Sequence, residues 1–277
     1  MVGALLSFLA MALGGRELAL TGMSTFQILF FRSVVGLLVI GMLVLDTGTM
    51  MLRTSRIKEH VWRNMAHFGG QFGWFFAIAA MPLAEVFAIE FTIPIWTALL
   101  AAMFLGERLT RARWFALALG LAGVGLVLRP GLAIVQPAAL AALGGALAYA
   151  TSHLMTKRLT STEAPLAILF YMTALQLPLG LLGALPQWQP VSPMQTPWLA
   201  VVGLTALSAH YCLARALQLA EVGTVLPIDF LRLPLVALLG WALYGEAIGI
   251  LAVAGAALIV AANIINLRSA RGRRVAP

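Results

Sequence analysis

The sequence is poor in charged residues and contains a single cysteine, Cys212. Only 10% of its 277 residues are Asp, Glu, Lys or Arg, whereas 61% are hydrophobic. A soluble domain of this length needs far more charge to cover its surface, which excludes an ordinary water-soluble fold. A lone cysteine excludes an intrachain disulfide and a thiolate metal site. No other metal ligands cluster, so we expect neither a metal nor a cofactor.

Acidic residues are scarcer than basic ones, and the formal net charge is +8. Such a balance can favour nucleic acid as a partner. Here, however, the basic residues lie between apolar runs rather than in one patch. We therefore predict no nucleic-acid partner and expect the lipid bilayer to surround the chain.

Long apolar runs fill most of the chain, and runs of about 20 residues can span a bilayer. We predict an all-α membrane protein with ten transmembrane helices, forming a single membrane domain over residues 1–277. The first run ends near small residues, as a signal peptide does, but no basic segment precedes it, so we expect a retained helix. The ten runs lie at about 2–20, 26–45, 60–80, 83–105, 111–128, 137–156, 164–185, 197–218, 222–244 and 247–267.

Basic residues gather on one side of the predicted membrane. If the N-terminus is inside and the chain crosses ten times, the opposite side receives only Arg16 and Arg129. Lys and Arg near membrane spans stay in the cytoplasm, so both termini are predicted to be cytoplasmic, with residues 268–277 as a basic tail. The inside residues are Arg53, Arg56, Lys58, Arg63, Arg108, Arg111, Arg113, Lys157, Arg158, Arg268, Arg271, Arg273 and Arg274.

One stretch occurs twice, about half the chain apart. Residues 77–107 and 214–246 both contain Leu-Ala-Glu-Val, then a proline-interrupted apolar run, then Gly-Glu. Basic residues follow the first copy directly, whereas the second has none until Arg268, which predicts opposite orientations in the membrane. The chain is therefore read as two inverted five-helix repeats, at about 1–130 and 137–267, an architecture typical of transporters.

A stripe of His67, Gln71 and Trp74 marks the third run at the spacing i, i+4 and i+7. These residues either form hydrogen bonds and packing contacts between helices or line a substrate pathway. Gly69 and Gly73 in the same run form a weak helix-packing signal.

Charged residues inside the other runs give further candidates for a substrate site. Asp229 and Arg232 share a helix face, either as a structural ion pair or as a site for a zwitterion or coupling ion. Glu90, near Trp96, could bind a substrate amine or a proton, or it could neutralise Arg32.

The eighth run carries Tyr211, Arg215 and Gln218 on one stripe, with Arg215 close enough to the cytoplasm to reach it. His153 and His210 are interpreted as structural histidines. Signatures of enzymes, such as a P-loop, a zinc-protease helix or a nucleophile elbow, are absent from the sequence, so we expect no enzymatic activity.

These motifs together resemble the drug/metabolite transporter superfamily, EamA type, over nearly the whole chain. The resemblance rests on Leu83–Val86 and Leu219–Val222, on Phe104–Arg108 and Tyr244–Glu246, and on the glycines at 120–125 with Gly255. Arg32 matches an arginine that family members often carry in helix 2, whereas Tyr171 stands at the corresponding place in the second half. Leu13-Gly14 replaces the family's frequent Trp-Gly pair.

The resemblance implies ten helices, an inverted repeat and alternating access around a central site. Within the superfamily the sequence is similar to bacterial exporters of amino acids, including aromatic ones, and also to S-adenosylmethionine carriers. We therefore expect an inner-membrane secondary transporter that exports amino acids or related small metabolites. A passive facilitator or channel and a membrane enzyme are the lesser alternatives. The candidate substrate-binding residues are Arg32, His67, Gln71, Trp74, Glu90, Trp96, Tyr211, Asp229 and Arg232.

Overall fold

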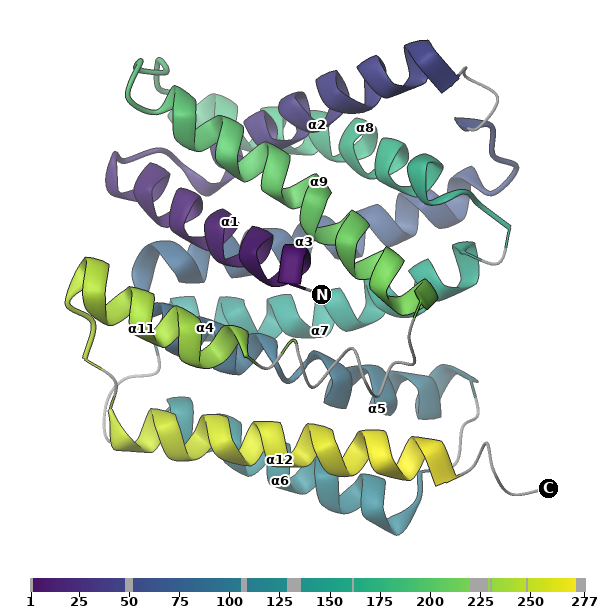
Figure 1. Ribbon diagram of the computed structural model, residues 1–277, viewed down its shortest axis with the longest axis vertical. Helices are drawn as coiled ribbons and strands as arrows, with labels where there is room; N and C mark the ends of the chain where they lie inside the picture. Colours follow the sequence, from purple (N-terminus) through teal and green to yellow (C-terminus); the bar gives the residue numbers. More distant parts are fainter. Residues whose placement is uncertain are drawn as a thin grey trace.

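The computed structural model describes residues 2–47, 52–105, 109–128, 136–160, 162–219, 229, 231–247 and 249–272. Within these ranges every regular element is a helix (Figure 1). Much of the second Leu-Ala-Glu-Val copy and both Glu107 and Arg129 lie outside the described residues. The elements are α1 (Val2–Leu20), α2 (Thr25–Thr47), α3 (Ile57–Ala80), α4 (Leu83–Glu90), α5 (Ile93–Leu105), α6 (Arg111–Leu128), α7 (Pro137–Leu159), α8 (Pro165–Ala184), η2 (Leu185–Gln187), α9 (Thr196–Leu219), α11 (Arg232–Tyr244) and α12 (Ile250–Gly272).

Eight segments among the described residues are long and apolar enough to cross a membrane, with α4 and α5 together forming one of them. The ten spans predicted from the sequence also included α3 and the run that ends with α11. Helix α11 has only 13 described residues. Helix α3 is long enough, but charged and amide side chains on its buried face lower its hydropathy.

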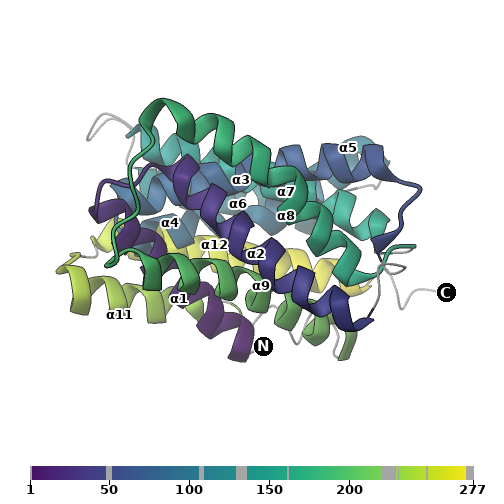
Figure 2. The ribbon, with the colours of Figure 1, turned by 90° about the horizontal axis from the view of Figure 1, so that it is seen from above.

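The helices pack in pairs that join distant parts of the chain. Helices α6 and α12 lie side by side at one end of the long axis, and α2 packs on α8 at the other end (Figure 1). Between them, α3 packs on α7 and α1 on α9. Figure 2 shows the same bundle from above, with the first and second halves of the chain interleaved rather than separated. The chain therefore forms one body whose middle layer contains α1, α3, α7 and α9.

Glycines let several of these helices meet backbone to backbone. A Cβ added at Gly73 of α3 would lie 2.2 Å from the carbonyl oxygen of Ala141 on α7. Gly123 of α6 and Gly255 of α12 face each other in the same way. A Cβ added at Gly123 would lie 2.7 Å from the Gly255 carbonyl oxygen, and one added at Gly255 would lie 2.5 Å from that of Gly123. Gly73 is thus at a helix contact as the sequence predicted. Gly70 also packs closely on α7, since an added Cβ there would lie 2.8 Å from the Tyr149 ring, whereas one at Gly69 would meet only Ala148, at 3.9 Å.

The break between α4 and α5 falls at Phe91 and Thr92, just before Pro94. Proline lacks an N–H group and cannot donate to the carbonyl four residues before it, and the next N–H, of Ile95, donates to Thr92 at 2.9 Å in place of a regular helical bond to Phe91. Two asparagines of α12 supply donors: Asn263 Nδ2 lies 2.6 Å from the Phe91 oxygen, and Asn266 Nδ2 lies 3.3 Å from the Pro94 oxygen. The bent segment is therefore held by a neighbouring helix, which is how such breaks are tolerated at membrane depth.

Candidate functional site

Helix α3 is polar on its inner face and apolar on its outer face. Trp62 and Met65 are 69% and 50% exposed, whereas His67 and Gln71 are almost completely buried. The buried polar positions recur at helical spacing, so they form one stripe along the side that faces the bundle. This arrangement is the reverse of a soluble helix and suits a protein whose surroundings are lipid and whose interior binds a polar solute. The stripe comprises His60, Arg63, Asn64, His67 and Gln71.

A hydrogen-bonded network fixes the middle of this stripe. Arg63 donates to Asn64 Oδ1 at 2.7 Å and to Thr156 Oγ1 of α7 at 3.1 Å. Gln176 of α8 places its Nε2 atom 3.0 Å from His67 Nδ1 and 3.5 Å from Asn64 Oδ1. Three helices, α3, α7 and α8, thus meet through amide, guanidinium and imidazole groups in the core.

Arg32 of α2 is 3% exposed and borders this network. It interacts electrostatically with Arg63, His67 and Tyr149, yet its Nε and Nη1 atoms have no hydrogen-bond partner among the described residues. The Nε2 and Oε1 atoms of Gln71 and the Oε1 atom of Gln176 are also buried without a hydrogen-bond partner among the described residues. Buried polar groups are nearly always paired, so several unpaired ones in one place indicate a site for a polar ligand or water. We name this group of Arg32, Arg63, His67, Gln71 and Gln176 the central polar cluster.

Aromatic rings border the central polar cluster. The His67 ring lies 5.3 Å from that of Tyr149 on α7 and 5.6 Å from that of His210 on α9, measured between centroids. His210 in turn packs edge-on against Phe8 of α1 at 5.9 Å. These rings connect the cluster to a second charged group, because the Arg232 guanidinium lies 4.4 Å above the Phe8 ring.

The second group consists of Arg232 between two carboxylates. Arg232 donates to Asp229 at 2.6 Å and to Glu90 of α4 at 3.2 Å, and Glu90 also accepts a hydrogen bond of 2.8 Å from Trp74 Nε1. The ion pair of Asp229 and Arg232 is as the sequence predicted. Glu90 is paired with Arg232, so the alternative that it neutralises Arg32 was wrong.

Among the described residues, two predicted site residues have no hydrogen bond, ion pair or ring contact with these groups. Trp96 is on α5, after the helix break, and donates to Thr92 within the same span at 3.0 Å. Tyr211 is 57% exposed, whereas the adjacent His210 contacts the His67 ring. Sequence reasoning missed Arg63, Tyr149 and Gln176 as members of the site. A lone glutamine in the apolar run 164–185 was the available signal for Gln176.

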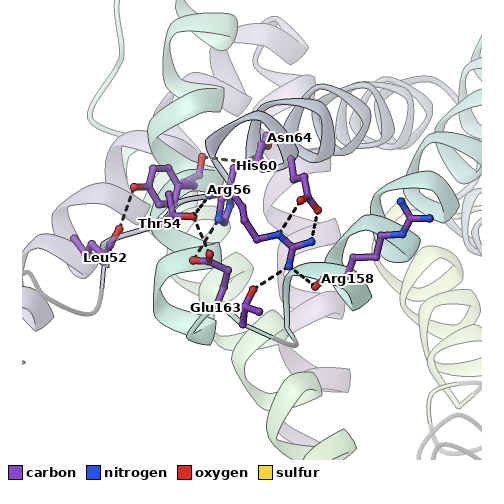
Figure 3. Close-up of polar contacts among 10 residues, drawn as sticks. Leu52, Thr54, Arg56, His60, Asn64, Arg158 and Glu163 are labelled. Atoms are coloured by element: carbon purple, nitrogen blue, oxygen red, sulfur yellow. Dashed lines mark hydrogen bonds and ion pairs between the residues drawn. The ribbon is translucent and has the colours of Figure 1, made fainter.

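Polar contacts also join the two halves of the chain at the edge that carries the basic loops (Figure 3). Thr54 donates to Glu163 at 2.8 Å, and Tyr171 donates from its hydroxyl to the Leu52 carbonyl at 3.0 Å. Arg56 donates to the Arg158 carbonyl at 2.8 Å and also binds Glu59. Its hydrogen bond to Glu59 lowers the pKa of that carboxyl, so the pair stays charged at neutral pH. We call these contacts the basic-edge interlock.

A helical bundle with exposed apolar side chains, a broken span and buried unpaired polar groups is typical of membrane transport proteins. The comparison with known families agrees. The sequence matches the EamA-like transporter family over residues 1–129 and again over residues 136–268. The chain belongs to this family, which lies within the drug/metabolite transporter superfamily that its motifs resembled.

Several relatives of this chain have names that state a substrate. A riboflavin transporter of Brucella anthropi is 31% identical over 258 residues, covering 91% of each chain. An S-adenosylmethionine uptake transporter of Rickettsia prowazekii is 25% identical over 249 residues, covering 90% of this chain and 85% of that one. A solved structure shares the fold over 99% of both chains, with a TM-score of 0.65 and 22% identity. These relatives support the alternative of another metabolite better than the expected export of amino acids.

Proposed function

We propose that this protein carries riboflavin across the bacterial inner membrane. The observation that carries the proposal is the central polar cluster, in which neutral amide and ring groups accompany two buried arginines. The similarity to riboflavin transporters over nearly the full length supports the same substrate.

Riboflavin suits such an interior because of its own chemistry. Its isoalloxazine ring is flat, aromatic and uncharged at neutral pH, and its edges carry carbonyl oxygens, ring nitrogens and one N–H. The rings of Tyr149, His67 and His210 can stack with a flat heterocycle, while arginine and amide groups can bind its polar edge. Ligand sites commonly combine aromatic walls with a few polar groups in this way.

S-adenosylmethionine fits the same cluster less well. It carries a positively charged sulfonium, and the charged side chains of the cluster are the guanidinium groups of Arg32 and Arg63. The nearby carboxylates of Glu90 and Asp229 are already bound to Arg232. A cationic ligand would therefore meet like charge in a low-dielectric interior, which is unfavourable.

Transport by alternating access is the mechanism that we propose for this fold. The ten crossings, the inverted repeat and the cytoplasmic position of both termini form part of this proposal. The helix pairing supports the inverted repeat. If α6 and α12 are the fifth helices of the two halves, the first helices are α1 and α7 and the third helices are α3 and α9. The first helix of each half then packs on the third helix of the other half, as α1 does on α9 and α7 on α3. In Figure 1 the described residues between α2 and α3 and between α7 and α8 lie at the right edge, and the C-terminal ends of α1 and α11 lie at the left edge. We propose transport and not catalysis as the activity.

The test is uptake of labelled riboflavin by proteoliposomes that contain the purified protein, with empty liposomes as the control. A carrier gives saturable uptake, and riboflavin loaded inside the liposomes accelerates the entry of label by counterflow. Unlabelled S-adenosylmethionine and tryptophan are added as competitors, and we expect neither to reduce the uptake. Saturable S-adenosylmethionine uptake without riboflavin uptake would replace this proposal with the other named substrate, and non-saturable flux would indicate a channel.

A further inference from the structure

We propose that the central polar cluster binds riboflavin by the imide edge of its ring, and that Arg32 is the residue that selects this edge. The inference rests on the proposed function and adds the orientation of the substrate. It starts from the hydrogen-bond donors and acceptors that the fold leaves unpaired in the core.

The hydrogen bond between Gln176 and His67 fixes the roles of several atoms. Gln176 Nε2 faces Asn64 Oδ1, and Asn64 uses its own Nδ2 to donate to the His60 carbonyl at 2.8 Å. Gln176 Nε2 is therefore a donor, so His67 Nδ1 accepts from it and the His67 proton resides on Nε2. His67 Nε2 is buried and has no partner, and it becomes an unused donor.

The unpaired groups include both donors and acceptors. Arg32 offers two donor nitrogens with three N–H groups, His67 offers one N–H, and Gln176 offers an acceptor through Oε1. Gln71 offers two N–H groups on Nε2 and an acceptor through Oε1. An imide presents carbonyl, N–H and carbonyl in a row, so it requires donor, acceptor and donor from its site. The cluster contains that set, whereas the methylated benzene end of the flavin ring would leave every one of these groups unpaired, at a cost for each.

Arg32 is the donor with freedom to serve a ligand. Arg63 is held by Asn64 and Thr156, but the Nε and Nη1 atoms of Arg32 have no partner among the residues that the structure describes. Arg32 therefore binds one imide carbonyl, and an amide oxygen of Gln176 or Gln71 accepts the imide N–H.

Two flavin analogues test the orientation on the unaltered protein. N3-methylriboflavin lacks the imide N–H, whereas an analogue with a larger amino group on the benzene ring keeps the imide intact. We expect the N3-methyl compound to compete about 10- to 100-fold more weakly than riboflavin, since a hydrogen bond to a buried group is lost. The benzene-ring analogue should compete within a few-fold of riboflavin. Equal competition by both analogues would overturn the proposed orientation.

Variants of Arg32 test the residue. Arg32→Gln should raise KM for riboflavin about 10- to 100-fold. It should also reduce the difference in competing strength between riboflavin and its N3-methyl analogue. Arg32→Lys should restore part of the affinity. Arg53→Gln makes the same chemical change at an exposed loop position and should leave KM unchanged.

The outcomes separate this inference from the proposed function. If unaltered protein takes up no riboflavin, the proposed function fails and the imide site fails with it. If uptake is saturable but Arg32→Gln leaves both KM and analogue discrimination unchanged, only this inference is overturned. Should Arg32→Gln fail to fold, the analogue comparison on unaltered protein still decides the orientation.

Discussion

Arg16 of α1 donates a hydrogen bond of 2.8 Å to Glu246, which follows α11 and lies 230 residues later in the chain. The second carboxylate oxygen of Glu246 accepts the backbone N–H of Leu83 at 2.8 Å, where α4 begins. Arg16 also donates to the Met81 carbonyl at 2.6 Å. One carboxylate thus joins three helices at the edge opposite the basic loops, and we call these contacts the opposite-edge interlock.

Replacing Glu246 should loosen the opposite-edge interlock. Glu246→Ala leaves the Leu83 N–H without its acceptor and removes the anionic partner of Arg16 in a mostly buried setting, at a cost of about 1–3 kcal/mol. We expect a lower melting temperature in detergent and faster thiol labelling of a cysteine placed at Leu83. Glu246→Gln keeps one acceptor oxygen and should have a smaller effect. An unchanged labelling rate in Glu246→Ala would show that this edge does not gate access.

The contact between α3 and α7 should not tolerate even one methyl group at Gly73. A Cβ there would lie 2.2 Å from the Ala141 carbonyl oxygen, so the helices must move apart. We expect Gly73→Ala to lower the melting temperature and reduce transport, with a cost of about 1–3 kcal/mol or more. Gly69→Ala is the matched control, because its Cβ has room and alanine favours helix. Equal stability of the two variants would contradict the contact.

Arg232 is expected to hold the fold rather than the substrate. Arg232→Gln leaves Glu90 and Asp229 buried without their cation, and breaking a buried pair in this way costs about 3–5 kcal/mol. The variant should therefore give low yield and a low melting temperature. Adding Asp229→Asn should restore part of both, with KM for riboflavin unchanged. A double variant that folds well but has a KM raised tenfold would instead make Arg232 a binding residue.

The predicted topology can be checked with two exposed positions in a Cys212→Ser background. Met194 is 84% exposed in the segment before α9, and Lys157 is exposed near the end of α7 among the basic residues. The rule that positive residues stay inside predicts that an impermeant maleimide labels Met194→Cys in intact cells and Lys157→Cys only after permeabilisation. Labelling of both in intact cells would contradict the ten-crossing arrangement.

The sequence predicted local relationships well. The pairing of Asp229 with Arg232 follows from their spacing of three residues, and His67, Gln71 and Trp74 are all buried as a helical stripe requires. These features depend only on the geometry of one helix, which periodicity records.

Relationships between helices could not be read from the sequence in the same way. The residues of the α3 stripe contact different helices. His67 contacts Gln176 of α8, whereas Trp74 contacts Glu90 of α4. The span that carries Glu90 and Trp96 breaks between them at Phe91 and Thr92, so the spacing of one continuous helix does not relate these two side chains. Tyr211 and His210 are adjacent, and a rotation of about 100° per residue around the helix separates an exposed ring from an interior one. Such differences depend on which helices meet, which a single sequence does not record.

The basic-edge interlock has an energetic consequence for the direction of opening. With polar contacts at both edges, the population that opens at either edge depends on the difference between the two sets and not on their sum. A change of about 1.4 kcal/mol at one edge alters that ratio tenfold. Under the alternating-access mechanism proposed above, substitutions at Thr54 or Glu163 are therefore expected to reset the resting orientation while every atom that contacts the substrate stays the same.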